Sequence, residues 1–194
     1  MANNMHHDAT SSEQNCANCS ELEQQISALK DQLAKMEQYA YHDVLTGLSN
    51  RRFFLDSLES RISRCQRYGD NCALLFLDVD DLKAVNDQHG HGAGDLLLAR
   101  LAEILKLHTR TSDVVARIGG DEFGLLLDNL DADEVVRKIA FLVDQFSKAN
   151  CTYANTSLKL GAAIGYCFVG PKDTVGGLMS RADAAMYRAK DKAQ

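Results

Sequence analysis

Residues 114–127, VVARIGGDEFGLLL, constrain the fold of this chain more than any other stretch. Two apolar runs flank the pair Gly119-Gly120, which is the pattern of two antiparallel strands joined by a turn. Asp121 and Glu122 follow directly, where the second strand should return to the core. A buried carboxylate costs free energy unless it is paired or binds a metal. The hairpin therefore predicts a charged site at one edge of a sheet.

The remaining sequence predicts helices and strands on both sides of this hairpin. The order is helix, strand, helix, hairpin, helix, strand, helix, with a loop rich in Asp and Gly between residues 79 and 95. This order predicts an α/β (α+β) domain with a mixed sheet that contains the antiparallel hairpin. The expected helices are 51–68, 96–107, 132–148 and 177–190, and the strands expected in addition to the hairpin are 72–78 and 157–169.

Composition excludes several classes of protein. The net charge of −6 argues against nucleic acid and anionic membrane as partners. No run of eighteen apolar residues predicts a membrane span, and the N-terminus lacks the apolar segment of a signal peptide. We therefore expect a cytoplasmic protein with reduced thiols at Cys65, Cys72, Cys151 and Cys167.

The first forty residues differ from the rest of the chain. Residues 1–20 form a polar tail, residues 21–41 carry an apolar repeat, and the predicted globular domain covers residues 42–194. The spacing of the repeat alternates between four and three, as in a coiled coil, and we expect a parallel homodimer stalk. An amphipathic helix that lies on its own domain is the alternative. The repeat residues are Leu22, Ile26, Leu29, Leu33, Met36 and Ala40.

The polar tail contains the pair Cys16 and Cys19 in the sequence CANC. This C-x-x-C spacing suits zinc, but a tetrahedral structural site needs four ligands. A parallel stalk would bring two copies of the pair together and complete a Cys₄ site across the dimer. Two free thiols in the tail are the alternative reading.

Three carboxylates fall near one edge of the predicted sheet. Asp78 ends the strand 72–78, and Asp121 and Glu122 stand at the hairpin turn. Two carboxylates on neighbouring strands can hold Mg²⁺ against a triphosphate for in-line attack on phosphorus. A solvated Asp-Glu turn is the alternative. An EF-hand loop from residue 78 is excluded because Leu82 occupies a ligand position, and the motifs of dinucleotide and Walker A sites are absent.

Four segments extend this pattern over residues 43–190. They are DVLTGLSNRR at 43–52, DVDDLKAVNDQHGHGAGD at 78–95, GGDEF at 119–123 and RADAAMYRAK at 181–190. In this order and spacing the chain resembles the GGDEF family of bacterial diguanylate cyclases. The second segment follows the family pattern D-x-D-x-F-K-x-x-N-D-x-x-G-H-x-x-G-D, with Leu82 in place of Phe. The resemblance implies a fold like that of nucleotidyl cyclases and polymerase palms.

The resemblance also implies a reaction. Two GTP molecules would condense to cyclic di-GMP and two pyrophosphates, with one GTP held by each protomer of a homodimer. Asp78, Asp121 and the Val79 carbonyl would bind two Mg²⁺ or Mn²⁺ ions at each GTP site. Glu122 would assist deprotonation of the 3′-hydroxyl group.

The nucleotide contacts implied by the resemblance come from the segment 78–95 and from the last helix. Asn86 and Asp95 would read guanine, because an amide and a carboxylate match the acceptors and donors of its edge. Lys83 and Lys190 would contact phosphates. Main-chain amides would add donors, and the residues that supply them are Asp80, Asp81 and Leu82.

A further motif precedes the hairpin. Arg110 and Asp113 form R-x-x-D, nine residues upstream of Gly119. The family often carries this motif as an inhibitory site for its own product, and an Arg side chain can bind phosphate or the guanine edge. Arg117 is predicted to contribute to the same surface. A surface ion pair at the start of a strand is the alternative.

The sequence departs from the family after Lys190. Gly-Arg usually follows this lysine, but here the chain reads Asp191-Lys192-Ala193-Gln194. We expect a weaker triphosphate clamp, for which Lys192 could compensate. Three functions remain open at this stage: an active cyclase, an inactive domain that binds GTP or cyclic di-GMP, and a coiled-coil scaffold with incidental nucleotide binding.

Overall fold

The computed structural model describes residues 22, 24–32, 36 and 40–193, without the side chains of residues 192 and 193. The chain divides into two compact units, residues 1–40 and 41–194. Within the first unit every described residue is helical. The side chains of Leu22, Ile26, Leu29 and Met36 are exposed there, which leaves the predicted apolar repeat open to solvent at these positions. Leu33, Cys16 and Cys19 lie outside the described residues.

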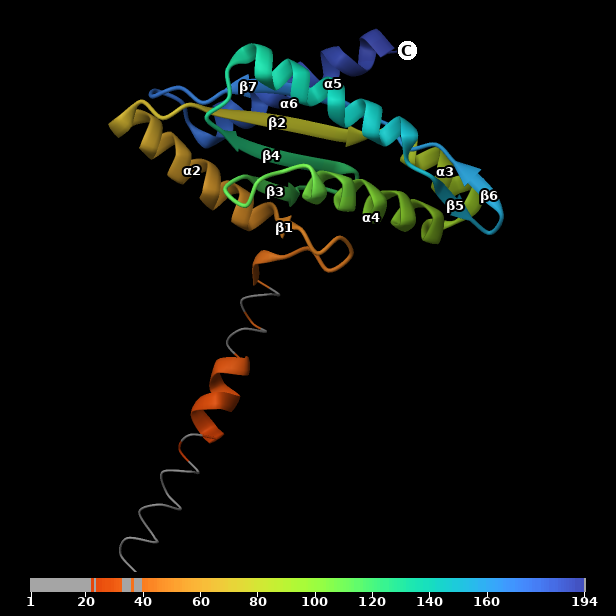
Figure 1. Ribbon diagram of the computed structural model, residues 1–194, viewed down its shortest axis with the longest axis horizontal. Coiled ribbons are helices and arrows are strands. Elements are labelled where there is room, and N and C mark those ends of the chain that lie inside the picture. The colour runs from red at the N-terminus through yellow and green to blue at the C-terminus, as the bar shows by residue number, and fades with distance from the viewer. Residues whose placement is uncertain (1–21, 23, 33–35, 37–39, 194) are drawn as a thin grey trace, which may run out of the picture. The chain divides into compact units, whose positions relative to one another are not determined.

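A five-stranded sheet forms the centre of the second unit, as predicted for a mixed α/β domain (Figure 1). The order across the sheet is β1 (Ser49–Asn50), β3 (Val114–Arg117), β4 (Glu122–Asp128), β2 (Cys72–Val79) and β7 (Ala162–Phe168). Strand β3 pairs with the parallel strand β1 on one side and with the antiparallel strand β4 on the other. Strand β2 is antiparallel to both β4 and β7.

Helices cover both faces of the sheet. Successive side chains of β2 point to opposite faces, as strand geometry requires. Leu74 and Phe76 pack with α2 (Arg51–Tyr68) and α6 (Val175–Ala193). Leu75 and Leu77 belong to the other core, with helices α3 (Leu82–His89), α4 (His91–Leu107) and α5 (Ala132–Lys148). The continuous apolar run of β2 is thus explained by burial on both sides.

Two local predictions were wrong, and one short strand was missed. The expected loop 79–95 contains α3 and the first turn of α4, which break at Gly90 with a φ of 83°. The expected strand 157–169 is divided into β6 (Thr156–Leu158), which pairs with β5 (Cys151–Tyr153), and the separate strand β7. The short strand β1, directly before α2, was not predicted. Short elements carry too few residues to show a helical or strand period.

Two properties of the described residues concern membranes and thiols. None of their helices has the length and apolar character needed to cross a bilayer. Cys65, Cys72, Cys151 and Cys167 are free thiols. Burial raises the pKa of Cys72 to about 12, so this thiol stays protonated.

Candidate active site

The acidic edge of the sheet lies where β2 and β4 meet. Asp78 and Glu122 are direct partners in the antiparallel register. The Val79 amide donates to the Asp121 carbonyl at 3.0 Å, which ties the turn to the end of β2. A Cβ atom on Gly119 would lie 2.4 Å from Oε2 of Glu122, so the glycine makes room for this carboxylate. The structure therefore brings together the three acids that the sequence predicted.

Lysine 190 reaches this edge from α6. Its ammonium group forms a salt bridge and a hydrogen bond with Oδ1 of Asp78, and this bond raises the pKa of Lys190. The acids also influence one another. Burial raises the pKa of Glu122, and the nearby charges of Asp121 and Asp78 raise it further. Three carboxylates close together repel one another unless cations are bound near them. The single ammonium group of Lys190 offsets only part of this negative charge.

The residues present fit a divalent cation that is bound together with a phosphate. Among the described residues, no group of three His, Cys, Asp or Glu side chains could hold a metal ion alone. Magnesium is usually bound through one or two carboxylates plus substrate phosphates, not by a complete protein cage. Asp78 and Asp121 on adjoining segments match that smaller donor set.

Asn86 and Asp95 lie on either side of the break between α3 and α4. A Cβ atom on Gly94 would lie 2.1 Å from Oδ1 of Asn86, so the glycine lets the amide pack against α4. Oδ1 of Asn86 is buried without a hydrogen-bond partner. A buried acceptor without a partner costs free energy, and a ligand N–H group would relieve this cost. Asp95 is exposed at the next position of α4.

The predicted phosphate donors differ in availability. The Asp80 amide donates to the Gly161 carbonyl at 3.0 Å, so the prediction that this amide is free for phosphate is contradicted. Asp81 has a φ of 53° and Leu82 begins α3. The first amides of a helix have no intrahelical acceptor and suit an anion. Lys83 is exposed in the same turn.

Arginine 117 has a different setting from the one predicted. Its guanidinium group donates to the Gly120 carbonyl at 2.7 Å from one nitrogen and 3.2 Å from another. It also donates to both carboxylate oxygens of Asp43 at 3.3 and 3.4 Å. Arg117 is not among the residues that line the cavity next to Arg110. The prediction that it contributes to that surface is therefore wrong, and its contacts join residue 43 to the GGDEF turn.

Asp43 should contribute to stability in a pH-dependent way. Burial raises the pKa of this carboxyl, but hydrogen bonds from Thr46 and the Arg117 charge outweigh burial and lower it below 3.8. The stabilisation is therefore complete above the unfolded pKa and is lost as the pH falls through the lower folded pKa. Asp43→Asn should cost about 1–2 kcal/mol at neutral pH. Thermal unfolding of both proteins should differ less at about pH 3 than at about pH 7; an equal difference would contradict this assignment.

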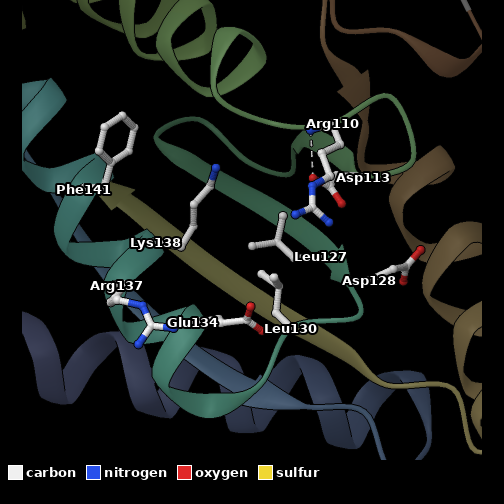
Figure 2. A pocket seen from close by; sticks show the side chains of 9 residues that line it. All are labelled: Arg110, Asp113, Leu127, Asp128, Leu130, Glu134, Arg137, Lys138 and Phe141. Atoms are coloured by element: carbon white, nitrogen blue, oxygen red, sulfur yellow. Dashed lines mark hydrogen bonds between the residues drawn. The ribbon is translucent and has the colours of Figure 1, made fainter.

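A second site surrounds the R-x-x-D motif (Figure 2). The Arg110 amide donates to Asp113 at 2.8 Å, and the Asp113 amide donates to the Arg110 carbonyl at 3.0 Å. These bonds close a tight turn beside a cavity of about 370 Å³. We name this cavity the Arg110 pocket. Its lining residues are Arg110, Asp113, Leu127, Asp128, Leu130, Glu134, Arg137, Lys138 and Phe141.

The α5 wall of the Arg110 pocket was missed from the sequence. Arg137 and Lys138 add two cationic side chains to the lining. Burial lowers the pKa of Lys138, whose ammonium group donates to the His108 carbonyl. The spacing of Glu134, Lys138 and Phe141 places them on one face of a helix. That spacing was visible in the sequence, but nothing indicated that this face turns toward Arg110.

Comparisons of the sequence with known proteins identify related diguanylate cyclases. The family model "Diguanylate cyclase, GGDEF domain" matches residues 40–194. The bifunctional diguanylate cyclase/cyclic di-GMP phosphodiesterase MucR of Pseudomonas aeruginosa is 40% identical over 179 residues. The diguanylate cyclase TpbB of the same species is 36% identical over 179 residues. These matches cover 89% and 90% of the chain, but only 26% of MucR and 40% of TpbB.

Solved structures show the same architecture. The coiled coil and GGDEF domain of DgcB from Caulobacter crescentus, in complex with c-di-GMP, gives a TM-score of 0.86 at 25% identity. That match covers 92% of this chain and 95% of the other. Diguanylate cyclase SiaD of Pseudomonas aeruginosa, in complex with its activator SiaC, gives a TM-score of 0.77 at 30% identity. That match covers 96% of this chain and 71% of the SiaD chain. The acidic edge, the two-sided sheet and these matches lead to one conclusion: the chain belongs to the GGDEF family of diguanylate cyclases.

Proposed function

We propose that this chain is a diguanylate cyclase that condenses two GTP molecules into cyclic di-GMP and two pyrophosphates. The observation that carries the proposal is the position of Asp78 at one sheet edge, where it is the register partner of Glu122 and forms a salt bridge with Lys190. The buried, unpartnered Oδ1 of Asn86 supports a nucleotide base as the ligand. The similarity to the diguanylate cyclases TpbB and SiaD supports the same reaction.

The side chains divide the chemistry between them. Asn86 and Asp95 hold guanine, while Lys190 and the first turn of α3 hold the phosphates. The 3′-oxygen of one GTP attacks the α-phosphorus of the other, and the bond from this phosphorus to pyrophosphate breaks. Glu122 takes the proton of the hydroxyl group. A second, equivalent step closes the ring.

A divalent cation is the cofactor that cyclases of this family generally use. Asp78 and Asp121, with the Val79 carbonyl, are the residues that would hold Mg²⁺ or Mn²⁺. Bound there, the cation would offset the charge that develops on the phosphate oxygens. Zinc at Cys16 and Cys19 remains a separate proposal for residues that lie outside the described part of the chain.

Two protomers are needed because each supplies one GTP. We propose that residues 21–41 join them in a parallel homodimer, since four apolar residues of this repeat, Leu22, Ile26, Leu29 and Met36, are exposed. A chain that dimerises reversibly loses its partner on dilution. The rate per protomer should therefore fall at low protein concentration.

The test is incubation of the purified protein with GTP and Mg²⁺, followed by chromatography of the nucleotides over a series of protein concentrations. Cyclic di-GMP from GTP but not from ATP would support the cyclase. Binding of GTP without turnover would indicate an inactive binding domain. If neither nucleotide binds, the chain would act as a coiled-coil scaffold. A constant rate per protomer over the dilution series would contradict the dimer alone.

Asp95→Ala should weaken GTP binding more than it lowers stability. One bidentate contact to a base edge contributes about 1–3 kcal/mol, or roughly tenfold to a hundredfold in affinity. Calorimetric titration with GTP and with ATP measures the change. Asp56→Ala, on the exposed side of α2, is the matched control. An unchanged preference for GTP would refute the guanine contact.

We also propose that the Arg110 pocket binds cyclic di-GMP and inhibits the enzyme. The pocket combines three cationic side chains with the acceptor Asp113, which suits a ligand with two phosphates and two guanines. The turn at residues 110–113 beside the pocket is held closed by the two hydrogen bonds between residues 110 and 113.

Arg110→Ala should leave the initial rate near that of the wild type and relieve inhibition late in the reaction. A progress curve with and without added cyclic di-GMP measures both quantities. If added product never slows the wild-type enzyme, the pocket is not an inhibitory site.

A further inference from the structure

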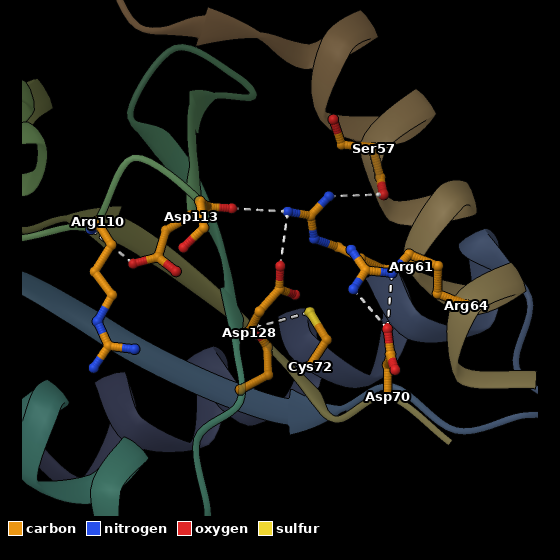
Figure 3. Close-up of polar contacts among 10 residues, drawn as sticks. Ser57, Arg61, Arg64, Asp70, Cys72, Arg110, Asp113 and Asp128 are labelled. Carbon is orange, nitrogen blue, oxygen red and sulfur yellow. Dashed lines mark hydrogen bonds and ion pairs between the residues drawn. The ribbon is translucent and has the colours of Figure 1, made fainter. Parts of the chain in front are cut away.

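Arg61 on α2 connects three segments next to the Arg110 pocket (Figure 3). Its guanidinium group donates to the Ser57 carbonyl at 3.5 Å and to the Ser112 carbonyl at 3.2 Å. It also donates to the carboxylate of Asp128 at 3.2 Å. The Arg61 and Asp128 side chains are only 13% and 16% exposed, so this is a largely buried ion pair.

The Ser112 contact bears on the shape of the pocket. Ser112 lies within the turn that the paired bonds of Arg110 and Asp113 close. The bond from Arg61 to Ser112 therefore ties this turn to α2. Arg61 is not one of the residues that line the pocket. A turn held in its binding geometry before the ligand arrives loses less entropy on binding.

The Asp128 contact bears on the charge of the pocket. Three of the lining side chains are acidic, Asp113, Asp128 and Glu134, and they share the pocket with the cations contributed by the 110 turn and by α5. An uncompensated carboxylate in the wall would repel a phosphate ligand. Arg61, which does not line the pocket, offsets the Asp128 charge through their ion pair. The third acid, Glu134, already accepts a hydrogen bond from the Asp131 amide at 2.8 Å.

The position of Arg61 is unfavourable for its own hydrogen bonding. Its Nε atom is buried and has no partner. A buried donor without a partner costs free energy, so the contacts at the other end of the guanidinium group determine where the side chain lies. Two of these contacts are to the 110 turn and to the pocket wall, and the third is to the Ser57 carbonyl of the same helix.

We propose that Arg61 is a positioning residue of the Arg110 pocket, which it prepares for an anionic ligand by fixing Ser112 and neutralising Asp128. The proposal rests on the proposed binding of cyclic di-GMP in that pocket. Asp128 pairs with Cys72 at the opposite end of β2 from Asp78, about 20 Å away along the strand. Product binding, not turnover, is therefore the quantity to measure.

The test is calorimetric titration of the full chain with cyclic di-GMP. Arg61→Met should raise the Kd about tenfold or more, equivalent to about 1.4 kcal/mol. Arg61→Met/Asp128→Leu should bind at least about threefold more tightly than Arg61→Met, because the repelling carboxylate is gone. Asp128→Asn should bind as tightly as the wild type or more tightly, since Arg61 still holds Ser112. A purely structural ion pair would give no such recovery.

Controls separate the possible failures. Arg67→Met, an exposed arginine on the same helix, should leave the Kd unchanged. If Arg61→Met does not fold, as judged by circular dichroism, Asp128→Asn decides, and weaker binding than the wild type would overturn the proposal. A Kd of Arg61→Met within twofold of the wild type, while Arg110→Ala loses binding, would overturn this proposal alone. Failure of the wild type to bind cyclic di-GMP would overturn the product site itself.

Discussion

Replacing Asp78 or Asp121 by asparagine is expected to lower cyclic di-GMP synthesis by at least about a thousandfold. Each substitution keeps the shape of the side chain and removes the negative charge that would hold a divalent cation against the triphosphate. The fold should survive, because Asp78 loses a single salt bridge to Lys190 and the acidic edge loses like-charge repulsion. The initial rate with GTP and Mg²⁺ measures the loss, and circular dichroism checks the fold.

A matched substitution separates site chemistry from a general effect of charge. Asp56→Asn removes one carboxylate from the exposed side of α2, where no cation is proposed. It should retain the wild-type rate. Wild-type turnover in either Asp78→Asn or Asp121→Asn would contradict the assignment of these residues as metal ligands.

The long elements and the acidic edge could be predicted from the sequence because their signals are local. The helices 51–68 and 132–148 were predicted with the bounds that the structure has. The hairpin was also correct, and the strand predicted at 72–78 is present but extends to Val79. Antiparallel pairing then places Asp78 opposite Glu122. The strand pattern and the family motif both place Asp78, Asp121 and Glu122 at this edge, so two independent signals in the sequence predict the same site.

The contacts between distant segments could not be predicted in this way. Arg61 and Ser112 are 51 residues apart, and Arg117 and Asp43 are 74 residues apart. An exposed arginine and a buried, paired one look the same in a sequence, because the difference is made by the packing of α2 and β3. Arg117 was assigned to the Arg110 pocket for this reason, although its guanidinium group is held by Asp43 and the Gly120 carbonyl.

Packing of the last helix leads to the second large effect. Gly165 lies in the middle of β7, opposite Phe76 of β2, and α6 crosses directly above it. A Cβ atom at this position would lie 2.0 Å from the Met186 nitrogen and 2.4 Å from the Ala185 carbonyl carbon. Both atoms belong to the helix backbone, so no change of side-chain rotamer can relieve the clash. The helix itself would have to move away from the sheet.

Gly165→Ala should therefore destabilise the second unit by at least about 3 kcal/mol. The corresponding fall in Tm is roughly 6–12 °C for a domain of this size.

Gly176→Ala, in the first turn of the same helix, is the matched control, since a Cβ there meets nothing within 4 Å. It should be neutral or stabilising by up to about 1 kcal/mol, because alanine restricts the unfolded chain more than glycine does. Thermal unfolding of the three proteins under identical conditions measures both shifts. Equal Tm values for the two variants would mean that α6 does not pack on β7 as closely as the geometry indicates. Because α6 also carries Lys190 to Asp78, the same displacement should lower the cyclase rate of Gly165→Ala even at temperatures where the protein remains folded.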